Sequence, residues 1–386
     1  MKEYLSEKSK KIGFSPIRSM VAKASVLDDV ITFALGEPDF DTPKPIVDAA
    51  IDALKRGETH YAPNKGVYAL RKAISDHYKG RGMDYDVEDE IMVTSGGIEA
   101  LFLVMSAVLD KGDEVIISNP YWSNHIEQIK YHEAVCVQVP VYEKDGFMYD
   151  PENLKKAITE KTKLLILNSP SNPTGGVATK ENLEAIARIA VENDILVISD
   201  DAYEHLRYDD GEIVHIASLP GMKERTFITN TFSKTYAMTG WRVGYACGPA
   251  EAIKMMVKLQ ENVVSCVNTP AQYGAAEALS GSQQPVADMV KEYAGRREIL
   301  IKGLNEIDGI FCLPPKGAFY AFANITKTGL TSVEFADRLL EEQHVVVVPG
   351  SGFGSAGEGF VRISYATSKE NIEEGLRRIK AFVENL

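Results

Sequence analysis

The chain has 386 residues, of which 45% are hydrophobic and 25% charged, which is ordinary for a soluble globular protein of two or three domains. Its net charge of −13 argues against nucleic acid as a main partner, because phosphate backbones need basic patches. The N-terminus lacks the apolar core of a secretory signal, and no apolar run approaches the roughly 18 residues that span a bilayer. We expect a cytoplasmic protein with no membrane partner.

Helix-type and strand-type patterns alternate from about residue 46 onward. Helical periodicity covers residues 45–56, 66–79, 98–110 and 180–193. Apolar, strand-type runs occur at 91–94, 114–118, 134–139, 163–168, 195–199, 226–230 and 242–246. In several of these runs both the odd and the even positions are apolar, which is typical of a sheet covered on both faces. The alternation predicts an α/β fold with a mainly parallel, doubly wound sheet.

The end of the chain has a different pattern. Strand-type runs at 318–325, 345–349 and 360–366 alternate with helical segments at 332–343 and 369–385, which indicates a smaller α+β unit. The first 45 or so residues have no sheet of their own to join, and a long helix over 251–300 is expected to link the two units. We predict a large domain over 48–280 and a small domain made from both chain ends, 1–47 and 281–386.

Two patterns are excluded as functional sites. Gly352, Gly354 and Gly357 have the spacing of a dinucleotide-binding loop, but that fingerprint needs a helix to open after the glycines. Here a strand-type run follows, so we interpret the glycines as a plain loop. The four cysteines are scattered and form no metal-ligand pattern with histidine, so no metal is predicted.

Lys234 lies beside a strand end in the segment TFSKTYAMTGWR, among hydroxyl and apolar residues that suit a solvated face poorly. On this pattern alone, a surface lysine in a loop is an equal alternative. The functional interpretation is an amine that bonds to a carbonyl cofactor, which must be desolvated or near positive charge to be neutral and nucleophilic. Arg242, eight residues further on, can supply that charge and bind a phosphate through two hydrogen bonds.

The segment around Lys234 resembles the cofactor-lysine signature of the class I and II aminotransferases, which have fold type I and depend on pyridoxal 5′-phosphate. Further matches occur in order at LGEPDFDTP (35–43), HYAPNKG (60–66), SPSNPTGG (169–176) and GFVRISYATS (359–368). Together they resemble the prokaryotic aspartate and aromatic branch over nearly the whole chain. The resemblance implies ping-pong transfer of an amino group from an L-amino acid to a 2-oxo acid, through pyridoxamine phosphate.

The resemblance also implies which residues bind the cofactor. At its phosphate it places the amides of Gly97 and Ile98, at a helix start, together with Thr231, Ser233 and Arg242. Around its ring it places Trp122 as a stacking partner, Asp200 at the ring nitrogen, and Asn172 and Tyr203 at the phenolate oxygen. Lys234, Asp200 and Tyr203 form the implied catalytic set.

Several of these positions also have ordinary structural interpretations. The glycines before Ile98 are needed by any strand-to-helix turn, and Trp122 could belong to the core. Asp200 could cap a helix, and Asn172 could belong to a turn. His125 is expected to orient the Asp200 carboxylate, although a histidine in a loop is more often satisfied locally.

Arg362 interrupts an otherwise apolar strand, and a buried guanidinium costs on the order of several kcal/mol unless it is paired. A substrate α-carboxylate is its natural partner. The resemblance assigns that role to Arg362 and adds Gly36, Trp122 and Asn172 to the substrate contacts. Tyr61 resembles a tyrosine that reaches the cofactor phosphate of the neighbouring subunit, which implies a homodimer with composite sites.

The preferred amino acid stays open at this stage. Where dicarboxylate-specific relatives carry cations, this chain has Ile98 and Asn268, so neutral or aromatic donors are expected to compete with aspartate. Arg18 is the candidate for a replacement cation. A pyridoxal-phosphate-dependent β-lyase on the same fold is an alternative. A non-catalytic cofactor-binding protein is a second one, against which the intact set of Lys234, Asp200 and Arg362 argues.

Overall fold

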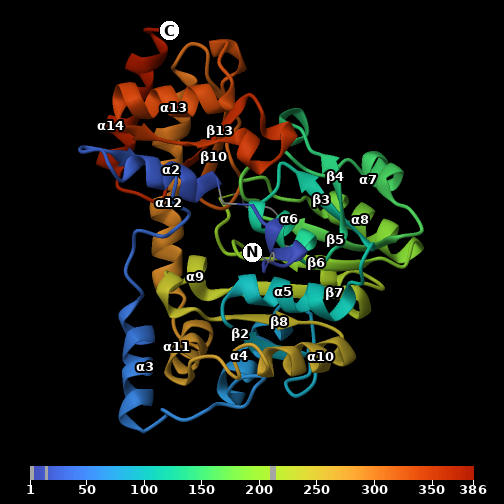
Figure 1. Cartoon of the computed structure of the whole chain (residues 1–386). Helices are drawn as coiled ribbons and strands as arrows, with labels where there is room; N and C mark the ends of the chain where they lie inside the picture. The colour runs from blue at the N-terminus through green and yellow to red at the C-terminus, as the bar shows by residue number, and fades with distance from the viewer. Residues whose placement is uncertain (1–3, 14–15, 209–213) are drawn as a thin grey trace.

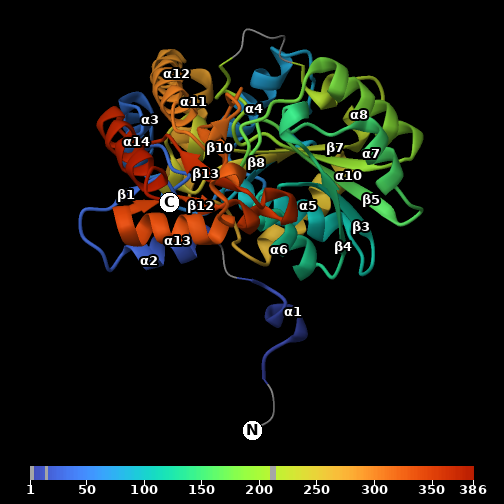
Figure 2. The ribbon, with the colours of Figure 1, turned by 90° about the horizontal axis from the view of Figure 1, so that it is seen from above.

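The computed structural model describes residues 4–13, 16–208 and 214–386. Its centre is a seven-stranded sheet with the order β2-β8-β7-β6-β5-β3-β4 (Figures 1 and 2). The strands are β2 (Ile91–Thr94), β3 (Glu114–Asn119), β4 (Val135–Pro140), β5 (Thr162–Asn168), β6 (Leu196–Asp200), β7 (Thr226–Thr231) and β8 (Gly244–Cys247). Neighbouring strands are parallel except where β8 pairs with β2 and with β7. The predicted mainly parallel α/β sheet is confirmed.

Successive residues of the central strands enter two different cores. In β5, Leu164 and Ile166 pack in one cluster, whereas Leu165 and Leu167 pack in the other. The first face is covered by α5 (Gly97–Val108), α6 (Ser123–Tyr131) and α10 (Ala250–Glu261), and the second by α4 (Tyr68–Lys79), α7 (Pro151–Ala157), α8 (Lys180–Glu192) and α11 (Thr269–Ser280). Because successive side chains point to opposite faces and each face packs in its own core, both the odd and the even positions of these strands are apolar.

The second unit contains a four-stranded antiparallel sheet with the order β12-β13-β10-β9. Its strands are β9 (Phe311–Cys312), β10 (Tyr320–Asn324), β12 (Val348–Pro349) and β13 (Phe360–Ser364). The accompanying helices are α2 (Pro16–Ala24), α12 (Gln284–Asn305), α13 (Ser332–Gln343) and α14 (Lys369–Val383), and α12 runs alongside both units (Figure 1).

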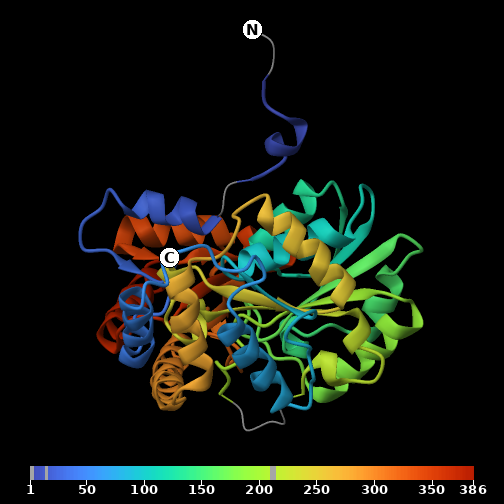
Figure 3. The ribbon, with the colours of Figure 1, turned by 90° about the horizontal axis from the view of Figure 1, so that it is seen from below.

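The remaining elements are short or peripheral. Helix α3 (Lys44–Lys55) packs on α11, and α9 (Phe232–Thr235) follows β7 directly. Helix α1 (Glu7–Lys10) lies beside α6 but projects from the rest of the ribbon (Figures 2 and 3). The short 3₁₀ helices are η1 (Glu143–Asp145), η2 (Ile216–Ser218), η3 (Lys223–Arg225), η4 (Thr239–Trp241), η5 (Thr326–Thr328), η6 (Gly350–Phe353) and η7 (Ser355–Gly357). Across the described ranges, every helix is too short or too polar to cross a membrane.

The prediction of one long helix over 251–300 is wrong, because three helices occupy this region. Asn268 caps α11 with its side chain, and Pro270 stands in the first turn of that helix. Gly281 ends α11, and Pro285 stands in the first turn of α12. Helical periodicity continues across these breaks, whereas the capping residues and prolines start new helices.

Two other expectations about the second unit need correction. The run at 345–349 forms two short strands, β11 (Val345–Val346) and β12, which belong to different sheets. The N-terminal segment does join a sheet, because β1 (Ile31–Thr32) pairs in parallel with β11. The loop interpretation of Gly352, Gly354 and Gly357 is confirmed, since η6 and η7 lead straight into β13.

Candidate active site

A cavity of about 170 Å³ lies where β5, β6 and β7 end. Parallel strands present their carboxyl ends at one edge of a sheet, which is where open α/β folds bind ligands. Ten of the residues predicted from the sequence line this cavity: Gly97, Ile98, Trp122, Asn172, Asp200, Tyr203, Thr231, Ser233, Lys234 and Arg242. The fold therefore gathers residues that are up to 145 positions apart, since 242 − 97 = 145.

Lys234 lies in the single turn of α9, directly after β7, and its Nζ donates to the Gly36 carbonyl at 2.6 Å. The pKa of this amine is lowered to about 8, mainly by burial; the charges of Arg242 and Arg362 contribute to the lowering, while Glu37 opposes it. Removal from water disfavours the ammonium form. A useful fraction of the amine is therefore neutral near physiological pH, as an attacking nitrogen requires.

Asp200 is the last residue of β6, and its carboxylate lies 2.8 Å from His125 Nε2 with both side chains buried. The predicted contact between His125 and Asp200 is confirmed. Trp122 meets the His125 ring edge-on, with ring centroids 5.2 Å apart. A buried carboxylate held by a histidine beside an indole suits a flat, protonated ring nitrogen, because the carboxylate can accept a hydrogen bond from the N–H group and stabilise its charge.

The opposite end of the cavity is suited to an anion. Helix α5 begins at Gly97, and Gly96 before it has no side chain to cap the first amides. A Cβ added to Gly96 would lie 2.4 Å from Arg242 Nη2. The φ of Gly96, +80°, also favours glycine. The Thr231 and Ser233 hydroxyls lie 2.8 Å apart next to these groups. Free helix amides, two hydroxyls and a guanidinium are together a fitting donor set for a phosphate.

Arg362 lies in β13 with no exposed surface. Its Nη1 donates to Asn172 Oδ1 at 3.0 Å and its Nη2 to the Ala34 carbonyl at 2.5 Å, while its Nε has no hydrogen-bond partner among the described residues. The guanidinium lies 4.4 Å from the ring centroid of Tyr320 and 5.0 Å from that of Phe353. Aromatic faces stabilise a cation in part and leave its hydrogen-bonding edge free.

The arrangement around Arg362 lacks an anion. No acidic side chain of the described residues forms an ion pair with it, and burial lowers the pKa of its guanidinium. A buried charge is normally paired, and carboxylates pair with guanidinium groups through two parallel hydrogen bonds. The position accordingly fits the carboxylate of a small molecule.

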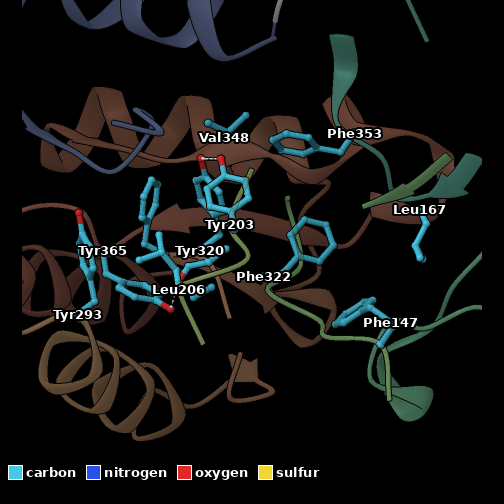
Figure 4. Packing of buried hydrophobic residues seen from close by; sticks show 14 of the residues in the cluster. Phe147, Leu167, Tyr203, Leu206, Tyr293, Tyr320, Phe322, Val348, Phe353 and Tyr365 are labelled. Carbon is cyan, nitrogen blue, oxygen red and sulfur yellow. Dashed lines mark hydrogen bonds between the residues drawn. The ribbon is translucent and has the colours of Figure 1, made fainter. Parts of the chain in front are cut away.

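Gly36 and Tyr203 connect the two parts of the site through Tyr320. A Cβ on Gly36 would lie 2.1 Å from the Tyr320 hydroxyl, so only glycine leaves room for that ring. The hydroxyls of Tyr203 and Tyr320 are 2.8 Å apart (Figure 4). Burial raises the pKa of Tyr203 well above its usual value, so its hydroxyl keeps its proton and can donate a hydrogen bond.

Sequence reasoning missed two polar side chains in this region. Asn168 ends β5, donates to the Asp200 carbonyl at 3.1 Å and accepts the Asn172 amide at 2.9 Å. A polar residue closing an apolar strand was the signal that could have identified it. Tyr320 gave no such signal, because it alternates within an ordinary strand.

Five candidates are not among the residues that line the main cavity. Gly36 and Arg362 adjoin it through their hydrogen bonds with Lys234 and Asn172, whereas Tyr61, Asn268 and Arg18 lie elsewhere. Tyr61 is 89% exposed and lines a separate, open hollow together with Asn268. The Asn268 side chain accepts the Ala271 amide at 3.0 Å as the cap of α11. Arg18 lies on α2 with an exposed side chain that forms no ion pair with any residue in the described ranges.

The sequence model of the aminotransferase class I and II family matches residues 28–379. This chain belongs to that family. It is 47% identical to the aspartate aminotransferase of Pyrococcus abyssi, over 97% of each chain, and 43% identical to aromatic-amino-acid aminotransferase 2 of Thermococcus litoralis, over 97% of each. The structure of Thermus thermophilus aspartate aminotransferase with maleate is 41% identical, covers 98% of this chain and 99% of its own, and has a TM-score of 0.94.

The protein is a transferase that uses pyridoxal 5′-phosphate to move amino groups between amino acids and 2-oxo acids. The cofactor supplies an aldehyde that condenses with amines and a pyridinium ring that withdraws electrons from the substrate Cα. The cavity fits this group, with a depressed-pKa amine at Lys234, a carboxylate at Asp200 and the phosphate-type donors around Gly97 and Arg242.

Lys234 should capture pyridoxal 5′-phosphate as the neutral amine. The fraction of neutral amine falls as pH drops below the pKa of about 8. The rate of capture by the apoprotein should therefore rise about tenfold per pH unit below that value and level off above it. Visible absorbance after mixing follows the rate, and borohydride reduction with peptide mapping should place the label on Lys234. A label on another lysine, or a rate independent of pH, would contradict the assignment.

Proposed function

We propose that this aminotransferase accepts aromatic and other neutral amino acids as well as aspartate, with 2-oxo acids as acceptors. The observation that carries the proposal is the make-up of the main cavity. Its cationic lining residues among those described are Lys234 and Arg242, which the cofactor would engage. The lining also has an apolar part made of Ile98, Leu101 and Trp122, and we place the substrate side chain there. An unpaired distal carboxylate there would cost on the order of several kcal/mol. Relatives named for aspartate and for aromatic amino acids support the same range.

In this proposal Arg362 and Asn172 hold the α-carboxylate while Gly36 leaves room for the substrate beside Tyr320. Lys234 Nζ takes the proton from the substrate Cα and later returns one. Asp200, oriented by His125, keeps a proton on the cofactor ring nitrogen. The β-lyase alternative gains no support, since the relatives described above are named as aminotransferases.

We also propose that Arg18 is the cation that meets the distal carboxylate of aspartate. Helix α2, which carries Arg18, packs against β12. Strand β12 pairs with β13, and Val348 is the register partner of Arg362. Arg18 therefore lies on a helix that packs on the strand next to the one that carries Arg362. This exposed cation can approach the substrate if α2 shifts inward, whereas Asn268 is occupied as a helix cap.

The domain division and the assembly are further parts of the proposal. We divide the chain into a large domain over 48–280 and a small domain over 1–47 and 281–386. In support, the seven strands of the central sheet fall inside 48–280 and the strands of the other two sheets fall outside it. We also propose a cytoplasmic location, which rests on the sequence alone.

The active unit is proposed to be a homodimer in which Tyr61 completes the site of the neighbouring subunit. Tyr61 is 89% exposed and Leu54, which lines the same hollow, is 52% exposed. Exposed aromatic and aliphatic side chains around one hollow favour burial against a partner. Tyr61 also does not reach the main cavity of its own chain, as a residue that acts in trans requires.

The substrate range is tested by kcat/KM for phenylalanine and aspartate, with 2-oxoglutarate as acceptor. In the wild type, kcat/KM for phenylalanine and kcat/KM for aspartate should lie within about tenfold of each other. The two substrates differ in one ion pair, which only aspartate can form with Arg18. Arg18→Ala should lower the value for aspartate about tenfold and leave phenylalanine unchanged.

The control for Arg18 is Lys23→Ala on the same helix, where Lys23 is already paired with Asp337 at 2.6 Å. This variant should leave both values unchanged. A strong preference for aspartate that survives Arg18→Ala would contradict both the apolar cavity argument and the role of Arg18.

The composite dimer is tested by mixing two inactive variants, Lys234→Ala and Tyr61→Ala. If Tyr61 acts in trans, each mixed dimer has one complete site, and random exchange should restore about a quarter of wild-type activity. Subunit exchange is verified by native mass spectrometry. Absence of recovery in verified mixed dimers would mean that Tyr61 acts within its own subunit or has no role.

A further inference from the structure

The segment 33–42 passes between the two cations at the centre of the site. The Ala34 carbonyl accepts Arg362 Nη2 at 2.5 Å, and the Gly36 carbonyl accepts Lys234 Nζ at 2.6 Å. Upstream, the backbone of Phe33 is fixed by hydrogen bonds with Val346 at 2.8 Å and Ser364 at 2.9 Å. The path of this segment therefore sets the position of both side chains that face the reacting molecule.

Arg296 of α12 holds the downstream part of the segment. Its Nη1 forms an ion pair with Asp39 at 2.7 Å, and its Nε pairs with Glu292 at 3.1 Å. The guanidinium also lies 5.0 Å from the ring centroid of Phe40 and 5.6 Å from that of Tyr293. Arg296 is only 6% exposed, so these contacts are weakly screened by water.

The geometry of these contacts requires arginine. A planar guanidinium can lie against aromatic faces while its edge donates to two carboxylates, which an ammonium group cannot do. Phe40 packs edge-on against Tyr293, with ring centroids 5.3 Å apart. The aromatic contact therefore holds Phe40, and the ion pair with Arg296 holds the adjacent residue, Asp39. Glu292 is itself paired with Lys369 at 3.0 Å, which ties this part of α12 to the start of α14.

The other anchors of the segment come from the loop that follows Lys234. The Thr239 hydroxyl donates to Glu37, and the Thr42 hydroxyl donates to the Ala237 carbonyl at 2.6 Å. Helix α12 contributes Arg296 and Tyr293, whose contacts with Asp39 and Phe40 lie between these two attachments. The carbonyls of Ala34 and Gly36 are thus placed by a short span fixed at both ends.

We propose that Arg296 is a positioning residue of the amino-transfer reaction. By holding Asp39 and Phe40, it keeps the Ala34 carbonyl against Arg362 and the Gly36 carbonyl against Lys234. Loss of this hold lets the segment move, so that Arg362 is no longer oriented for the substrate carboxylate. The inference rests on the proposed role of Arg362 as the carboxylate anchor.

The test compares holoenzymes carrying Arg296→Gln or Asp39→Asn with the wild type. Both variants should raise KM for phenylalanine and weaken calorimetric binding of 3-phenylpropionate about ten- to a hundredfold, because small displacements of a positioned group have such effects. The value of kcat should change less. Hydrogen–deuterium exchange of peptides covering 33–42 should become faster. If Arg296→Gln does not fold, Asp39→Asn alone provides the test, because the Asp39 side chain is 31% exposed and its replacement disturbs the core less.

Two controls separate positioning from general stability. Lys302→Gln removes a charge from the same helix at a side chain that is 80% exposed, and it should change none of these quantities. Arg296→Lys keeps the charge but not the planar edge, so it should bind 3-phenylpropionate more tightly than Arg296→Gln and less tightly than the wild type. Equal binding and equal exchange in Arg296→Gln, Asp39→Asn and the wild type would overturn the proposal, as would a loss of thermal stability with KM unchanged.

Arg362→Met distinguishes failure of this inference from failure of the proposed anchor. If that variant binds 3-phenylpropionate as the wild type does, Arg362 is not the anchor and the basis of the inference is lost. If it binds far more weakly while the Arg296 variants bind normally, the anchor stands and the role of Arg296 is refuted.

Discussion

The Arg362 guanidinium is fully buried, donates two hydrogen bonds and has no acidic partner in the described part of the chain. Its neighbours come from three distant segments, namely the Ala34 carbonyl, the Asn172 amide group and the Tyr320 ring. Each of them is neutral, so the positive charge is solvated but not neutralised. A carboxylate that enters the site completes the arrangement, and the protein therefore binds carboxylates at a point that the fold has already desolvated.

The Arg362 charge, together with that of Arg242, also affects the chemistry of Lys234. The pKa of its amine is lowered to about 8, mainly by burial, and the guanidiniums of Arg242 and Arg362 contribute to this lowering. Both arginines lie where the resemblance places an anion of cofactor or substrate. When those anions bind, they offset the two positive charges, so the basicity of Lys234 responds to occupancy of the site. Binding and proton transfer are linked through this electrostatic coupling.

Alternation along β6 decides which of two adjacent carboxylates serves the cavity. Asp200 faces the cavity, whereas Asp201 points to the other side of the sheet, where it accepts from His215 and Ser199 at 2.6 Å each. A single register shift would exchange the two residues. The sequence motif singled out Asp200, and the pleat of the strand provides the physical reason.

Residues at strand ends could be predicted because periodicity and polarity identify them locally. The alternating patterns located the sheet, and hydroxyl groups beside a strand end drew attention to the segment around Lys234, whereas the role of Asp200 came from the family resemblance. Tyr320 could not be found in this way, because its hydroxyl becomes significant only when β10 folds beside Gly36. The breaks around α11 were also missed, since a cap such as Asn268 competes with a helical pattern that runs through it.

The most direct test of this account is the stability of Arg362→Met measured without and with a carboxylate. Replacing a buried, unneutralised charge by an apolar side chain should leave the substrate-free holoenzyme as stable as the wild type, or more stable by roughly 1–4 kcal/mol in the free energy of unfolding. Adding 3-phenylpropionate should stabilise the wild type and not the variant, since binding to the native state alone raises stability. A variant that is several kcal/mol less stable and still gains stability from 3-phenylpropionate would contradict the account.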